Sequence, residues 1–150
     1  SDGAEPSGNA IHCENLLRLY QLTFDDKYFE QAIDIFKAAQ QFILNYAPGY
    51  CYHMMNLIRY YDKDAVTAVV ALNDEGQYSH ELRQLFFHAY LPHRLLVWRR
   101  PNDEKLQKLI PYTAEYAPIE GKTTLYLCHK GVCRKPITEL SEMITTLHEL

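Results

Sequence analysis

The sequence predicts an α+β fold in which a helical segment, residues 1–64, precedes a small α/β lobe, residues 65–150. Two observations predict this division. Apolar residues recur at helical spacing through the first part of the chain. After Asp64 the hydrophobic period changes, and short β-rich apolar runs alternate with helical stretches. A chain of 150 residues is long enough for one domain or for two small lobes.

Three helices are predicted in the first part. The first, residues 9–24, carries leucines near helical spacing, with Ser7 or Asn9 available as N-cap. The second, residues 25–46, has a continuous apolar stripe and begins with two aspartates, which suit the positive end of a helix dipole. The sequence Ala-Pro-Gly-Tyr then breaks the helical pattern, and residues 51–62 form a short third helix.

The second part has the predicted order β-α-β-α-β-β-α. Residues 65–72, 94–98 and 124–128 are expected to be strands of one sheet. Helices between strands favour a parallel pair, and the last tight turn adds an antiparallel hairpin. This order matches a thioredoxin-like layout with three layers. No C-x-x-C motif precedes the helix after the first strand, where a working thioredoxin keeps it, so the lobe is expected to be redox-silent at that position.

Composition and charge argue against several classes of protein. A net charge of −4 without a basic block argues against nucleic acid or an anionic membrane as partner. No apolar run approaches the roughly 20 residues that span a bilayer. The start, SDGAEPSGNA, lacks the basic and apolar regions of a signal peptide and indicates a chain entered in the middle of a longer protein. Four cysteines fall short of a disulfide scaffold, so a reducing compartment, the cytoplasm, is expected.

Cys128 and Cys133 flank the tetrapeptide His-Lys-Gly-Val, which is expected to be the turn of a β-hairpin. Three interpretations are open: reduced structural thiols, a disulfide, or part of a metal site. Residues that face each other across such a hairpin have Cα atoms about 4.5–5.5 Å apart, within disulfide range. Zinc is disfavoured because a closed site needs four convergent ligands. No metal and no cofactor is therefore predicted. Pro136 is expected to end the short last strand, and Thr138 to cap the last helix.

Residues 73–76, Asn-Asp-Glu-Gly, follow the first predicted strand, where ligands often bind in open α/β sheets. The sequence has neither G-x-G-x-x-G nor a P-loop there. A nucleotide site is therefore not predicted.

Two stretches at opposite ends of the chain carry a resemblance. DGAEPSGNA followed by a leucine-rich helix, and LYLCHKGVCRKPIT near the C-terminus, together resemble the large thioredoxin-domain-containing proteins related to the spermatogenesis-associated thioredoxin-like protein, a family with bacterial relatives. In that family an N-terminal thioredoxin-like domain precedes an (α/α)6 toroid similar to N-acylglucosamine 2-epimerases and six-hairpin glycosidases. The resemblance spans nearly the whole chain. It implies that residues 1–64 are the last toroid helices and that residues 65–150 are a small C-terminal lobe.

The resemblance implies a carbohydrate-related activity for the longer protein, an isomerase or glycosidase, and a non-catalytic role for this part of it. Asp2 and Glu5 lie in a loop that would line the mouth of the toroid, where a carboxylate pair can act as acid and base; the alternative is that they stabilise the following helix. The expected partners are the rest of the parent chain and a sugar ligand of the parent. The alternative function is a protein-interaction module, or a thiol-redox regulator that works through Cys128 and Cys133.

Overall fold

A computed structural model describes residues 1–63, 65–88, 93–129 and 132–150. The chain divides into two compact units, Ser1–Ala65 and Val66–Leu150. The first contains helices alone and the second a mixed sheet with helices, so the predicted α+β class is confirmed. Along the described residues, no helix has both the length and the apolar character that a bilayer crossing requires.

The first unit is almost wholly helical, as predicted. It contains α1 (Gly8–Thr23), α2 (Asp26–Asn45), the 3₁₀ helix η1 (Ala47–Tyr50) and α3 (Cys51–Tyr61). The Ser7 hydroxyl accepts a hydrogen bond from the Ala10 backbone N–H (3.3 Å), so Ser7 rather than Asn9 is the N-cap of α1. Asp25 caps α2 by accepting from the Lys27 backbone N–H (3.1 Å).

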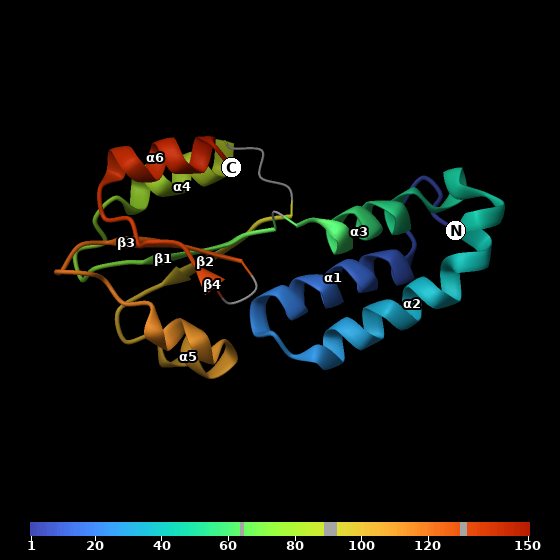
Figure 1. Cartoon of the computed structure of the whole chain (residues 1–150), viewed down its shortest axis with the longest axis horizontal. Helices are drawn as coiled ribbons and strands as arrows, with labels where there is room; N and C mark the ends of the chain where they lie inside the picture. Colours follow the sequence, from blue (N-terminus) through green and yellow to red (C-terminus); the bar gives the residue numbers. More distant parts are fainter. Residues whose placement is uncertain (64, 89–92, 130–131) are drawn as a thin grey trace. The chain divides into compact units, whose positions relative to one another are not determined.

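The core of this unit lies where α1 packs beside α2 (Figure 1). Its buried members are Cys13, Leu16, Leu17 and Ala32, with Tyr28, Ile35, Phe36 and Tyr60 packed against them. Burial raises the pKa of the Cys13 thiol to about 11, because the thiolate would lose its hydration. Cys13 is therefore protonated at neutral pH and serves as a small apolar residue.

The second unit is built on one four-stranded sheet. Its strands are β1 (Thr67–Ala71), β2 (Leu95–Arg99), β3 (Thr124–His129) and β4 (Val132–Cys133). Their order is β2-β1-β3-β4; β1 and β2 are parallel, while β3 is antiparallel to both of its neighbours. This confirms that residues 65–72, 94–98 and 124–128 contribute strands to one sheet.

Helices cover both faces of the sheet (Figure 1). On one side lie α4 (Ser79–His88) and α6 (Leu140–His148), and on the other lie α5 (Glu104–Leu109) and the 3₁₀ helix η2 (Pro111–Glu115). The main core forms on the α4 and α6 side. It contains Leu82, Met143 and Leu147 from the helices, with alternate residues of the strands such as Val70 and Leu125. Every residue of β1 is buried, which explains why its sequence is a continuous apolar run rather than an alternating one.

The C-terminal hairpin differs from its prediction. His129 pairs with Val132, so both belong to strands, and the two residues between them lie outside the described part of the chain. The last strand ends at Cys133, before Pro136. The N-cap position of α6 is Glu139, not Thr138, and no side chain caps that helix. The physical reason is that Ile137 bonds back to Leu125 through both backbone groups (2.8 and 3.0 Å), which holds the chain against β3 at residue 137, and Glu139 is still extended, so the helix begins only at Leu140.

Candidate functional site

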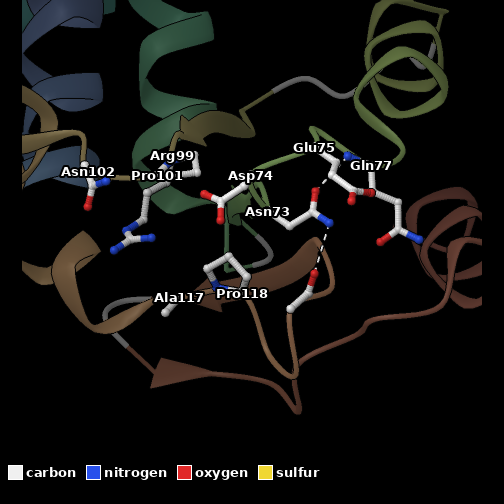
Figure 2. A pocket seen from close by; sticks show the side chains of 10 residues that line it. Asn73, Asp74, Glu75, Gln77, Arg99, Pro101, Asn102, Ala117 and Pro118 are labelled. Atoms are coloured by element: carbon white, nitrogen blue, oxygen red, sulfur yellow. Dashed lines mark hydrogen bonds between the residues drawn. The ribbon is translucent and has the colours of Figure 1, made fainter.

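A cavity of about 680 Å³ opens at the edge of the sheet where β1 and β2 end (Figure 2). Because these strands are parallel, the loops that follow them meet at one edge, and the segment before the antiparallel β3 closes the third side. The lining residues are Asn73, Asp74, Glu75, Gln77, Arg99, Pro101, Asn102, Ala117, Pro118 and Gly121. The cavity therefore stands where the sequence places Asn-Asp-Glu-Gly after the first strand.

Asn73 holds the loop after β1 in place. Its Oδ1 accepts from the Gln77 backbone N–H (2.8 Å), and its Nδ2 donates to the Gly121 carbonyl (3.0 Å), as Figure 2 shows. Its own backbone N–H donates to Thr123 Oγ1 (3.1 Å). Gly76 has a φ of +66°, which favours glycine, and its N–H donates to the Asn73 carbonyl (3.0 Å). One side chain thus ties two walls of the cavity together.

Arg99 is the last residue of β2 and forms another wall of the cavity. Its backbone carbonyl accepts from Leu72 N–H (2.9 Å), which holds the ends of β1 and β2 together. Only 9% of the residue is exposed, and its Nε is buried without a hydrogen-bond partner among the described residues. Burying a guanidinium costs several kcal/mol unless a partner satisfies it. Asp74 and Glu75 are exposed at the rim, and neither forms an ion pair with Arg99 in the described structure.

Asp2 lies in the first unit and is not part of this cavity. Its side chain is 9% exposed; Oδ1 accepts from Ser7 N–H (2.8 Å) and Oδ2 from Tyr52 N–H (2.8 Å). Nδ1 of the buried His53 lies 3.7 Å from Oδ2. Burial alone would raise the pKa of Asp2, but the hydrogen bonds and His53 outweigh it, so the pKa lies below its ordinary value. Asp2 thus joins the loop before α1 to the start of α3.

Glu5, the other carboxylate singled out in the sequence, is exposed. Its backbone carbonyl accepts from Gly3 N–H (3.0 Å). The hydrogen bonds of Asp2 go to Ser7 and Tyr52, so the structure does not assemble the two side chains into a carboxylate pair. The helix-stabilising interpretation is the one that the contacts of Asp2 fit.

Replacing Asp2 with Asn is expected to lower the free energy of unfolding at pH 7 by about 1–3 kcal/mol, because one buried N–H would then face an amide donor. The folded-state pKa is depressed, so this stabilisation is present above the unfolded-state pKa of about 4 and is lost as pH falls through the folded-state value. The difference between wild type and Asp2→Asn should therefore shrink at low pH. Urea unfolding followed by circular dichroism measures this difference in stability, and hydrogen exchange of the Tyr52 amide reports on the bond to Asp2. Glu5→Gln is the control; equal stability of wild type and Asp2→Asn at pH 7 would contradict this role.

Cys128 and Cys133 are joined by a disulfide in the structure. They are cross-strand partners in the β3–β4 register, so both side chains face one side of the sheet. The Tyr116 hydroxyl donates to Cys133 Sγ (2.8 Å), since a disulfide sulfur has no proton of its own. Closing so short a loop removes about 2 kcal/mol of chain entropy from the unfolded state. Cys128 pairs with Thr67 at the start of β1, so the disulfide lies at the opposite edge of the sheet from the cavity.

The remaining cysteines and histidines form no metal centre in the described residues. Cys13 is buried and Cys51 is exposed, and both are free thiols. No group of three or more His, Cys, Asp or Glu side chains in the described ranges could hold a metal ion.

Sequence reasoning noticed the loop at residues 73–76 but not the side chains opposite it. Arg99 and Asn102 follow an apolar run, and Pro118 precedes β3. Arg99, the first of two arginines that follow the predicted strand, was the available signal, because a charged residue that completes a buried strand needs a partner or a ligand.

The fold and the cavity define an α+β protein with a polar cavity at the carboxyl edge of a mixed sheet. The chain is 24% identical over 149 residues to spermatogenesis-associated protein 20 of Rattus norvegicus, covering 99% of this chain and 19% of that protein. The human protein of that name is 24% identical over 148 residues, 98% of this chain and 19% of the relative. An uncharacterized protein of Caenorhabditis elegans is 29% identical over 143 residues, with 95% and 19% covered.

These proteins are homologues at low identity, which supports the resemblance drawn from the sequence at the level of relationship. The chain spans about a fifth of the length of the curated relatives it matches. No family model matches the chain. No solved structure matches it significantly either.

Proposed function

We propose that the chain is a non-catalytic binding module belonging to a larger protein related to spermatogenesis-associated protein 20. In this proposal Val66–Leu150 is a thioredoxin-like lobe, and Ser1–Ala65 supplies the last helices of an α/α toroid. The β-α-β-α-β-β-α order supports the first assignment, together with a parallel β1–β2 pair and an antiparallel β3–β4 hairpin in one sheet. The second assignment is supported by three successive helices and by the distant relationship.

The proposal rests on the identity of the residues that follow β1. A working thioredoxin has its C-x-x-C motif before the helix that follows this strand. Here residues 73–76 are Asn-Asp-Glu-Gly, and a cavity lined mainly by polar side chains opens beside them. Such an edge can hold a ligand but has no thiol with which to reduce one. The disulfide at the other edge of the sheet does not replace it.

The proposed partner of the helical unit is the rest of the longer protein. Met54, Met55, Ile58 and Tyr61 recur at helical spacing along α3, and all four are exposed, Ile58 by 62% and Tyr61 by 71%. A contiguous apolar face of this kind is typical of an interaction surface. Relatives about five times as long as this chain offer further segments that could cover it.

The family resemblance alone supports a carbohydrate-related activity of the longer protein. The contacts of Asp2 and the exposure of Glu5 add nothing to it. The sugar ligand is therefore assigned to the longer protein, and we assign no catalytic residue to this chain.

The binding role can be tested by titrating the isotope-labelled chain with a panel of small polar fragments while recording amide chemical shifts. We expect the perturbed amides to cluster at residues 73–77, 99–102 and 117–121, because these loops line the cavity. The groove beside Trp98 and Arg83 serves as internal control, since it is apolar. Perturbations confined to that groove, or none with any fragment, would contradict a binding site at the carboxyl edge.

A further inference from the structure

Arg99 places a positive charge in the wall of the cavity, and no carboxylate of the described residues forms an ion pair with it. The residue is nine-tenths buried, lines the cavity, and has an Nε with no partner among the described residues. The hydroxyl of Tyr126 already donates to the Ala117 carbonyl (2.6 Å), and burial raises the pKa of Tyr126 although the charge of Arg99 opposes this. A buried guanidinium whose Nε donor has no partner among the described residues can donate hydrogen bonds to an anion that enters the cavity.

The groups around Arg99 narrow the choice of anion. Asp74 and Glu75 stand at the rim and are exposed, so water and salt weaken their interaction with a bound anion, whereas the charge of the buried Arg99 is screened less. The repulsion that remains after screening grows with the charge of the ligand, so a multiply charged phosphate is repelled by Asp74 and Glu75 more strongly than a single carboxylate is. The planar guanidinium also matches a carboxylate in a two-point geometry.

The other lining residues can contact a polar, uncharged part of a ligand that carries this anionic group. The amide side chains of Asn73, Gln77 and Asn102 can hydrogen-bond to peptide groups, and Pro101 and Pro118 offer apolar contact. About 680 Å³ is within the usual range for a small-ligand pocket and exceeds what a bare anion needs.

We propose that this cavity binds a singly charged carboxylate ligand with a peptide-like polar body, and that Arg99 holds the carboxylate. The shared chemistry belongs to N-acylated amino acids and to the free C-terminus of a peptide. This proposal rests on the binding role assigned to the cavity above and specifies its ligand class.

The test uses the full chain and isothermal calorimetry with four probes: N-acetylglycine, a short polar peptide with a free carboxyl terminus, the same peptide amidated, and inorganic phosphate. We expect the free-acid peptide to bind at least ten-fold more tightly than its amide, because the amide loses a charge-assisted hydrogen bond. Phosphate should bind more weakly than either carboxylate. Binding of N-acetylglycine as tightly as the free-acid peptide would assign the ligand to N-acylated amino acids. Binding of the peptide alone would assign it to the C-terminus of a peptide chain.

Variants assign the effect to one side chain. Arg99→Gln should weaken carboxylate binding ten-fold or more, and Arg99→Lys should fall between it and wild type, since lysine keeps the charge but loses the two-point geometry. Arg100→Gln is the matched control, because Arg100 is the exposed neighbour in sequence. Amide spectra of each variant establish that the sheet is intact.

Equal affinity for acid and amide, tighter binding of phosphate, or no loss in Arg99→Gln would overturn the carboxylate assignment. That outcome differs from failure of the binding role itself, for which no fragment of any charge would perturb the amides lining the cavity.

Discussion

Leu125→Ala is expected to lower the free energy of unfolding of the second unit by about 2–5 kcal/mol, which is a large share of the stability of a small domain. Leu125 is fully buried in β3 and belongs to the same core cluster as Val70 and Met143. Its backbone bonds to Ile137 (2.8 and 3.0 Å) fix the strand above the core. The strand therefore cannot sink to fill the space that the side chain leaves, and a cavity remains.

Urea unfolding followed by tryptophan fluorescence measures this effect in the intact chain. Trp98, the single tryptophan, lies in β2 and reports on the second unit. Leu109→Ala is the matched control, because Leu109 is 73% exposed and its loss should change stability by no more than about 0.5 kcal/mol. If Leu125→Ala and Leu109→Ala unfolded at the same urea concentration, the packing of β3 against α4 and α6 would be wrong.

The order and type of the helices and strands were predictable from the local pattern of apolar residues. The run Ala-Val-Thr-Ala-Val-Val-Ala-Leu indicates a buried strand because it is apolar on both faces, and β1 is indeed buried at every residue. The helical period before Asp64 likewise predicted three helices. Elements of this kind are specified by residues close together in sequence, so periodicity alone is enough to place them.

The cavity was only partly predictable. Residues 73–76 could be singled out because they follow a strand, but most of the rest of the lining comes from loops that lie far along the chain. The bond between Asn73 and Thr123 joins residues 50 positions apart, and the bond between Asp2 and Tyr52 does the same in the first unit. No spacing rule in a single sequence announces such contacts, because they depend on how the elements pack.

The hairpin shows a second limit of sequence reasoning. The expected turn predicted that Cys128 and Cys133 face each other across the hairpin, and they do. The sequence left open whether the two thiols form a disulfide. The prediction that Thr138 caps the last helix was wrong. Capping preference depends on neighbouring residues, whereas the start of the helix depends on backbone hydrogen bonds between Ile137 and Leu125, which are far apart in sequence.

We expect the chain to lack thiol reductase activity. The cysteines of the structure are a buried thiol, an exposed thiol without a resolving neighbour, and a disulfide at the amino edge of β1. Reduction of a protein disulfide needs a thiolate and a nearby second thiol at one accessible place. Cys128 is only 3% exposed, so the two thiols would not both be accessible even after dithiothreitol opened the Cys128–Cys133 bond. The carboxyl edge of β1 carries Asn73, Asp74 and Glu75 in that place, and none of them can transfer electrons.

Insulin reduction with dithiothreitol as electron donor tests this most directly, with a C-x-x-C thioredoxin as positive control. We predict that the chain produces no turbidity beyond the rate of dithiothreitol alone, and that Cys128→Ala/Cys133→Ala leaves this background unchanged. Catalysed insulin reduction by the wild-type chain, lost in Cys128→Ala/Cys133→Ala, would contradict the assignment of this lobe to binding and would make the hairpin a redox centre.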